Sequence, residues 1–143
     1  FLEEPDGWIE NKLNSCLVLS CCYQAMGENA AAFDILFYSF TMDVPRAEIC
    51  CEIGRLFMEK KEYVTAVYWY QQALLAPRKK KNGGFYIADS HDFIPAIQMC
   101  VCLDKAGRHR EAFEFHKKAR VLKPLHQAVI GNEKYFRDVW GME

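Results

Sequence analysis

The sequence predicts an all-α protein built from successive pairs of antiparallel helices. Two observations lead to this fold class. The apolar residues recur with helical spacing and nowhere alternate over the length of a strand, and one pattern of small and aromatic residues occurs three times. The 143 residues, 51% hydrophobic and 26% charged, have the composition of one globular domain. A formal net charge of −1 argues against a nucleic-acid binder, which needs a basic face.

The repeated pattern places small and bulky residues at fixed intervals. Its three copies are Cys16-x-x-Leu19-Ser20-x-x-Tyr23 with Ala32, Leu36, Ser39 and Pro45; Cys50-x-x-Ile53-Gly54-x-x-Phe57 with Ala66, Tyr70, Ala73 and Pro77; and Ala96-x-x-Met99-Cys100-x-x-Leu103 with Ala112, His116, Ala119 and Pro124. The first two begin at Leu13 and Ala47, 34 residues apart. The third begins at Phe93, 46 residues after Ala47, which corresponds to 34 plus an insertion of 12. This period and pattern are typical of tetratricopeptide repeats.

We therefore predict a tetratricopeptide-like right-handed superhelix of three helix pairs plus a C-terminal capping helix. One domain spans residues 1–143, with repeats at about 13–46, 47–77 and 93–126 and an insertion at 78–92. The capping helix covers about 125–140, because a solenoid must shield its last apolar face. Its predicted inward side carries Leu125, Val129, Phe136 and Val139.

Small residues mark the points where paired helices cross. They are Ser20, Gly54 and Cys100 on the first helices and Ala32, Ala66 and Ala112 on the second. Larger side chains there would push the two helices apart. Beside these crossings the pattern places Tyr23, Phe57 and Leu103, and the run Tyr68-Trp69-Tyr70 implies a helix that is covered on more than one side.

Helix ends are marked by capping and turn residues. Asp6-Gly7 offers a cap for a first helix that runs to about Met26 and stops at Gly27. Asp43 and Pro45 open the second pair, and Gly107 separates the helices of the third.

The insertion begins as a polar loop and ends in an apolar stretch. Its basic run, Arg78 to Lys81, either binds an anion or is a solvated helix C-terminus, and the second explanation is the simpler. Phe85, Tyr86 and Ile87 are too apolar to stay in solvent, so they fold back onto the helices or meet another chain or domain. Pro95 must lie in the first turn of the next helix, which Ser90 to Asp92 caps.

The seven cysteines predict a reduced protein without a metal. Their odd number and spacing fit neither a disulfide scaffold nor a zinc site, although a site that combines them with histidines is an alternative. The pairs His91 with Asp92, and Glu111 with His109 and His116, lack any accompanying nucleophile or phosphate-binding motif, so we expect no catalysis and no cofactor. We expect His116 to be a packed core residue.

Several segments resemble the tetratricopeptide tail of bacterial family 2 glycosyltransferases. The segments are Asp6-Gly7-Trp8-Ile9-Glu10-Asn11, Pro45-Arg46-Ala47-Glu48-Ile49-Cys50, Trp69-Tyr70-x-x-Ala73-Leu74, Asp92-Phe93-Ile94-Pro95-x-x-Gln98-x-Cys100-x-Cys102, and Lys123-Pro124 with Asn132-x-x-Tyr135-Phe136. The resemblance implies an accessory region that follows a catalytic domain with an acidic metal-binding motif. This sequence contains neither that domain nor that motif, so no catalytic residue carries over.

The groove of the superhelix is the first candidate interaction surface. Its predicted lining is Leu17, Cys21, Cys51, Arg55, Ile97 and Val101, with Phe85, Tyr86 and Ile87 as further contacts. Tetratricopeptide modules that clamp the carboxylate of chaperone tails use Lys, Arg and Asn at such positions. That clamp is not matched here, so the more apolar groove suits a packed helix or domain.

We expect an interaction and assembly module of a glycosyltransferase that supports self-association or acceptor positioning. Its expected partners are the parent's own catalytic domain, a second copy of the chain, or a peptide or protein acceptor. The alternative is a free-standing adaptor that binds a peptide or helix in its groove. Without a signal peptide or an apolar run of membrane length, the sequence favours a cytoplasmic protein with no membrane partner. Because it begins at Phe1, we expect it to be a piece of a longer polypeptide.

Overall fold

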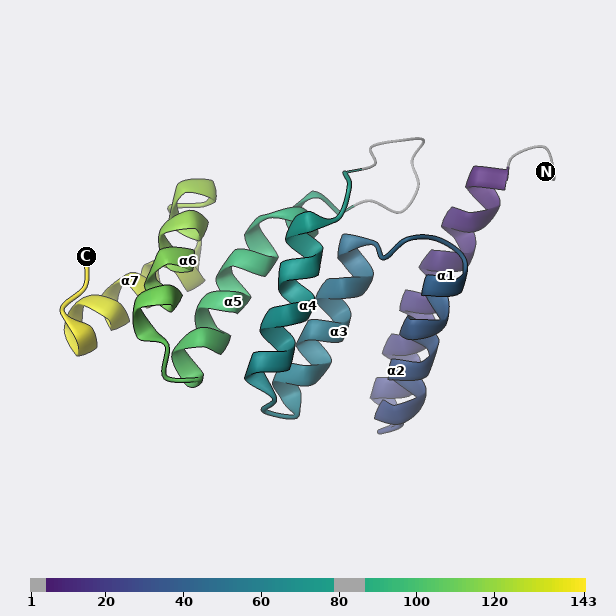
Figure 1. Ribbon diagram of the computed structural model, residues 1–143, viewed down its shortest axis with the longest axis horizontal. Helices are drawn as coiled ribbons and strands as arrows, with labels where there is room; N and C mark the ends of the chain where they lie inside the picture. Colours follow the sequence, from purple (N-terminus) through teal and green to yellow (C-terminus); the bar gives the residue numbers. More distant parts are fainter. Residues whose placement is uncertain (1–4, 79–86) are drawn as a thin grey trace.

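The protein is all-α in the computed structural model, which describes residues 5–78 and 87–143. These residues contain no β-strand. The helices are α1 (Pro5–Ala25), α2 (Asn29–Tyr38), α3 (Ala47–Glu59), α4 (Tyr63–Leu75), α5 (Phe93–Lys105), α6 (His109–Leu122) and α7 (Gln127–Trp140), with short 3₁₀ turns η1 (Ser39–Thr41) and η2 (Ala88–His91). They stand in one elongated row, with α1 and α2 at one end and α7 at the other (Figure 1).

Consecutive helices form three closely packed pairs, α1 with α2, α3 with α4, and α5 with α6. Each pair is joined by the same turn. Gly27, Lys61 and Gly107 have left-handed backbone conformations, with φ of 76°, 61° and 85°. The next N–H in each case donates to a carbonyl five residues back: Glu28 to Tyr23 at 2.8 Å, Glu62 to Phe57 at 2.9 Å and Arg108 to Leu103 at 2.9 Å. The predicted stops at Gly27 and Gly107 are confirmed, and the three turns have the spacing of the repeat starts.

Lys61 is the one non-glycine residue among these three turn positions. A left-handed conformation costs an L-residue with a Cβ about 1 kcal/mol, which glycine avoids. We expect Lys61→Gly to raise the free energy of unfolding by roughly 0.5–1 kcal/mol. Urea unfolding followed by circular dichroism measures this change, and Lys60→Gly, one residue earlier, should be destabilising instead. A loss of stability in Lys61→Gly would contradict the assignment.

The small residues of the repeated pattern lie at buried helix crossings. Ser20, Ala32, Ala66 and Ala112 are fully buried, and Cys100 is 1% exposed. Gly54 on α3 faces the ring of Tyr70 on α4 so closely that an added Cβ would lie 2.8 Å from Tyr70 Cε2. The pattern therefore marks buried helix positions, and at Gly54 it marks a close contact between the two helices of a pair.

Aromatic side chains join the first pair to the second. The ring of Trp69 on α4 lies 5.6 Å from Phe37 and 5.9 Å from Phe40, and Phe57 lies 4.8 Å from Phe33. Leu36, Ile49, Ile53 and Leu56 form the buried centre of this contact. Of the run 68–70, Tyr70 is buried and Trp69 half-buried, whereas Tyr68 is exposed, so α4 is covered on two sides.

Two predictions about the chain ends are wrong. The first helix begins at Pro5, so Asp6 lies inside the helix and does not precede it as a cap. On α7, Val129 and Phe136 are buried as predicted, but Leu125 is 85% and Val139 56% exposed. The helix begins only at Gln127, after Leu125, and Val139 lies in its last turn, one residue before the helix ends at Trp140.

The end of the insertion folds back onto the helices. The Ile87 N–H donates to Glu48 Oε2 at 2.6 Å, and Cys51 Sγ donates to the Ser90 carbonyl at 3.4 Å. At the other end of η2, Asp92 caps α5 through the Phe93 N–H, and Pro95 lies in the first turn, both as predicted. Arg78 pairs with Asp92 at 3.0 Å. The remaining residues of the basic run, together with Phe85 and Tyr86, lie outside the described residues.

Candidate interaction surfaces

The predicted groove is only partly open. Cys51 and Ile97 are buried, so a partner cannot reach them, which corrects their assignment to a free surface. Cys51 lies beneath η2, and Ile97 packs with Phe93, Ala119 and Val129. Cys21 is exposed, and Leu17, Arg55 and Val101 are intermediate. Ile87 is 51% exposed, so its backbone rather than its side chain anchors the segment.

A polar cluster bridges α1 and α3 at the Arg55 position of this groove. Gln24 Nε2 donates to Glu52 Oε2 at 3.0 Å, and the Arg55 guanidinium binds Glu52 at 2.6 Å and also contacts Gln24 and Glu59. Burial opposes ionisation of Glu52, but the hydrogen bonds from Arg55 and Gln24 outweigh it and lower its pKa. The groove between these helices is therefore polar, not apolar as the sequence predicted, and Arg55 is occupied by intramolecular partners.

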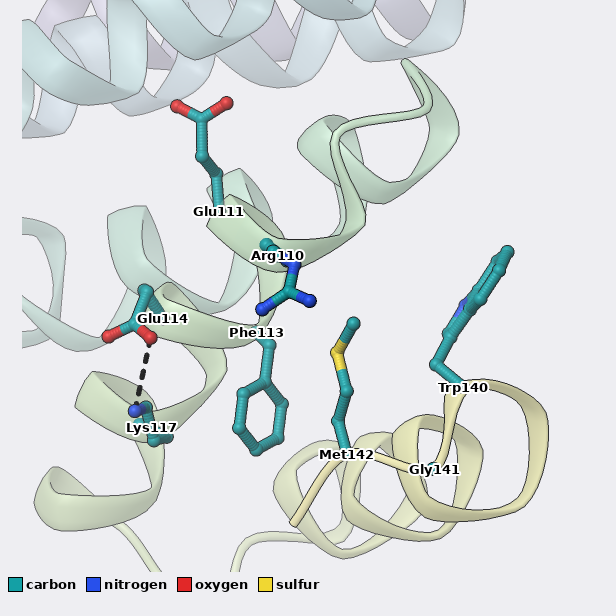
Figure 2. A pocket seen from close by; sticks show the side chains of 8 residues that line it. All are labelled: Arg110, Glu111, Phe113, Glu114, Lys117, Trp140, Gly141 and Met142. Carbon is teal, nitrogen blue, oxygen red and sulfur yellow. Dashed lines mark ion pairs between the residues drawn. The ribbon is translucent and has the colours of Figure 1, made fainter.

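A second surface is a pocket of about 520 Å³ between α6 and the end of α7, here called the α6–α7 pocket (Figure 2). It is lined by Arg110, Glu111, Phe113, Glu114, Lys117, Trp140, Gly141 and Met142. Figure 2 shows the Arg110 guanidinium directed toward Phe113 and Met142, while Glu111 points away. The pocket thus combines an apolar floor with a charged rim.

Of the charged side chains that line this pocket, the two glutamates and Lys117 form ion pairs. Glu111 binds Arg108 at 2.6 Å, and Glu114 binds Lys117 at 3.1 Å. Among the described residues Arg110 has no ion pair or hydrogen bond, so its guanidinium is the cation left to bind a ligand. A planar guanidinium beside aromatic and thioether groups suits a carboxylate that is attached to an apolar group.

Sequence reasoning missed this pocket because its parts are far apart in the chain. One signal was present: Arg110, Phe113, Glu114 and Lys117 follow the i, i+3, i+4, i+7 spacing of a single helix face. The other wall depends on how α7 ends, at Trp140 and the left-handed Gly141, and its position follows only from tertiary packing.

Polar contacts hold α7 in place beside the pocket. The buried His116 donates from Nε2 to Glu133 at 2.6 Å, and Arg120 binds the same carboxylate at 2.8 Å. These hydrogen bonds, that of His116 first, lower the pKa of Glu133. His116 is the packed histidine that the sequence predicted.

A second polar group fastens the far end of α7. Asp104 accepts from His109 Nδ1 at 2.6 Å and from the Tyr135 hydroxyl at 2.7 Å, and the His109 ring stacks on Trp140 at 3.9 Å. Several independent contacts therefore fix the position of α7, which forms one wall of the α6–α7 pocket.

The remaining titratable groups do not assemble a metal site. His91 Nε2 lies 3.9 Å from the buried Glu48, and the described residues contain no group of three His, Cys, Asp or Glu side chains that could hold a metal ion. In the same part of the chain no helix has the length and apolar character needed to cross a bilayer.

All seven cysteines are free thiols. Burial raises the pKa of Cys50, Cys100 and Cys102 to about 12, and it also raises the pKa of Cys16 and Cys51. Cys21 and Cys22 are exposed. Because the thiolate is the reactive form, the buried thiols are protected by both exclusion and protonation.

We expect two fast-reacting thiols when the native protein meets an aromatic disulfide reagent at neutral pH, and all seven after unfolding in urea. Because unfolded thiols ionise above about pH 8.5 while the buried ones stay protonated, these groups make the free energy of unfolding fall as pH rises above that value. Cys21→Ser/Cys22→Ser is the control and should abolish the fast phase. Rapid reaction of that variant would contradict the burial of the other five.

No family model matches the sequence, and a search of curated proteins finds no match.

Proposed function

We propose that this chain is a non-catalytic protein-interaction module: a tetratricopeptide-like right-handed superhelix whose α6–α7 pocket binds a peptide segment. Three pairs with identical turns and small residues at every crossing support this architecture. The observation that carries the binding function is Arg110, a cation without an ion pair among the described residues, directed into an apolar pocket (Figure 2).

The chemistry of the pocket defines the ligand. Phe113 and Met142 offer apolar contact, and Arg110 offers two parallel N–H donors to a carboxylate. The neighbouring Glu111 and Glu114 are neutralised by Arg108 and Lys117, so they do not cancel the charge of Arg110. A peptide with an acidic residue next to a large apolar residue fits this arrangement.

The test uses an acetylated, amidated pentapeptide with a central Glu flanked by Leu and Phe. In a titration of the ¹⁵N-labelled chain, we expect amide shifts at α6 and at residues 140–142. Arg110→Glu should weaken binding about 10-fold or more, since it replaces attraction by repulsion. Lys118→Glu is the matched control, because Lys118 lies on the same helix but does not line the pocket. A second peptide carries Gln in place of the central Glu. If it binds as tightly as the Glu peptide, or if Arg110→Glu binds the Glu peptide as tightly as the unchanged chain does, the proposal is contradicted.

In the fuller form of the proposal, the chain is the accessory region of a family 2 glycosyltransferase and uses its surfaces for self-association or acceptor positioning. The resemblance of the segments quoted above supports this form. We expect no turnover of sugar nucleotides by the isolated chain and concentration-dependent association in sedimentation experiments. Turnover would contradict the accessory role, and a strict monomer at high concentration would remove self-association.

The coding sequence upstream of Phe1 separates this form from a free-standing adaptor. A strand-rich region with an Asp-x-Asp motif would support the transferase, and a start codon directly before Phe1 would support the adaptor.

A further inference from the structure

The row of helices ends in an apolar surface at α1 and α2. A pocket of about 400 Å³ opens there, and its lining includes Trp8, Lys12, Ser15, Leu19, Ile35 and Tyr38. We call Lys12, Ser15, Leu19, Ile35 and Tyr38 the end face. Leu19 is 43% and Tyr38 56% exposed, and both line the pocket together with the buried Cys16.

The end face of the first helix pair corresponds, one repeat later, to the surface of the second pair that packs against α2. Lys12, Ser15, Leu19 and Ile35 each precede by 34 residues a residue of the second pair: Arg46, Ile49, Ile53 and Trp69. In that pair Ile49 and Ile53 are fully buried against α2. The same helical positions thus carry an interface on the second pair and an exposed surface on the first.

The internal interface shows which chemistry covers such a face. Trp69 is covered by Phe37 and Phe40, and Phe57 by Phe33, so α2 and the following turn η1 present aromatic residues at i, i+4 and i+7. Arg46 binds both carboxylate oxygens of Glu10 on α1, at 3.1 and 2.7 Å. The cover therefore consists of an aromatic stripe together with a carboxylate.

Lys12 repeats the charge of Arg46 without its ion pair. Its ammonium lies 4.7 Å from the centre of the Trp8 ring, and among the described residues it forms no salt bridge. Lys12 is therefore positioned to meet a carboxylate from outside, at the place where Glu10 meets Arg46.

We propose that the end face is the docking site for an amphipathic helix of a separate protein, which carries an aromatic stripe and a flanking carboxylate. The docked helix would extend the row by repeating the contact between the first and second pairs. This inference goes beyond the proposed function, because it concerns the opposite end of the molecule from the α6–α7 pocket.

The other end of the chain is poorly suited to this role. On α7 the exposed Ile130 shares its side of the helix with Lys134 and Arg137, which share the single carboxylate of Asp138. A second copy docked through α7 would bring cations rather than a carboxylate toward Lys12. A separate partner with an acidic flank complements the face better.

The experiment uses the full chain and a fluorescein-labelled peptide of residues 29–41, the segment that covers Trp69, with two glutamates added at each end. Fluorescence anisotropy should show saturable binding of one peptide per chain. Leu19→Asp should weaken binding about 30-fold or more by placing a charge in the apolar contact. Lys12→Glu should weaken it roughly 5- to 10-fold, and a peptide with lysines in place of the glutamates should restore binding to that variant. Val139→Asp, at the other end, is the control and should bind normally.

Three results would overturn the inference. Absence of binding to the wild-type chain would show that the face does not accept such a helix. Binding that persists in Leu19→Asp would show that the peptide replaces the chain's own α2. If the chain forms a dimer that the Leu19→Asp substitution dissociates and that the peptide does not disrupt, the occupant of the end face is a second copy of the chain. None of these results depends on Arg110, so the experiment tests docking at the end face independently of peptide binding in the α6–α7 pocket.

Discussion

Replacing Gly54 by alanine is expected to lower the free energy of unfolding by about 1–3 kcal/mol, although alanine is the better helix former. An added Cβ would lie 2.8 to 3.0 Å from three atoms of the Tyr70 ring. Tyr70 is 1% exposed and its hydroxyl contacts Met58, so the ring has no space into which to move. The α3–α4 pair must therefore separate, and Gly54→Leu should prevent cooperative folding.

Gly131→Ala is the matched control for this prediction. Gly131 also lies within a helix, α7, but an added Cβ would meet no atom within 4 Å. We expect this variant to gain roughly 0.5–1 kcal/mol from helix propensity. Urea unfolding followed by circular dichroism compares the two. Equal effects of both substitutions would show that the Tyr70 contact does not limit the size of residue 54.

Phe136→Ala is expected to lower the free energy of unfolding by about 3–5 kcal/mol and to release α7. The Phe136 ring is 1% exposed and lies 5.3 Å from Phe113 and 5.5 Å from His116. Its removal leaves a cavity between α6 and α7 that the surrounding rings cannot fill. Hydrogen exchange should show faster exchange in α7 than in α3 and α4.

Val139→Ala is the control on the same helix. Because Val139 is 56% exposed, we expect a change within about 0.5 kcal/mol. A large effect at Val139, or a small one at Phe136, would contradict the packing of α7. The α6–α7 pocket shares this packing, so Phe136→Ala should also weaken the peptide binding proposed for Arg110.

Much of the fold could be predicted because it depends on local and periodic properties. The glycines at 27 and 107 take left-handed conformations that end helices, and Asp92 caps α5 where Pro95 requires a first turn. The capping helix was predicted from an apolar stripe, but the stripe alone could not show that Leu125 and Val139 remain outside the contact.

The candidate surfaces were predicted less well. The repeat spacing predicts that Cys51 and Ile97 line the groove. In the structure η2 covers Cys51, and Ala119 of α6 and Val129 of α7 pack against Ile97. Arg55 is partly exposed, but it contacts Gln24 on α1, 31 positions away, as well as Glu52 on its own helix. Arg110 was not singled out, because its importance depends on Trp140 and Met142 from the end of α7.

The helices, their turns and the small residues of the repeated pattern follow from local sequence, because each of these depends on neighbours within one or two helical turns. The repeated pattern marks Gly54 without reference to Tyr70, its partner on α4. The tertiary structure decided which surfaces stay open. Cys51 contacts Ser90, 39 positions away, and Arg55 contacts Gln24, 31 positions away, whereas Leu19 stays exposed. Such contacts have no fixed spacing in the sequence, since the path of the chain between the helices sets them.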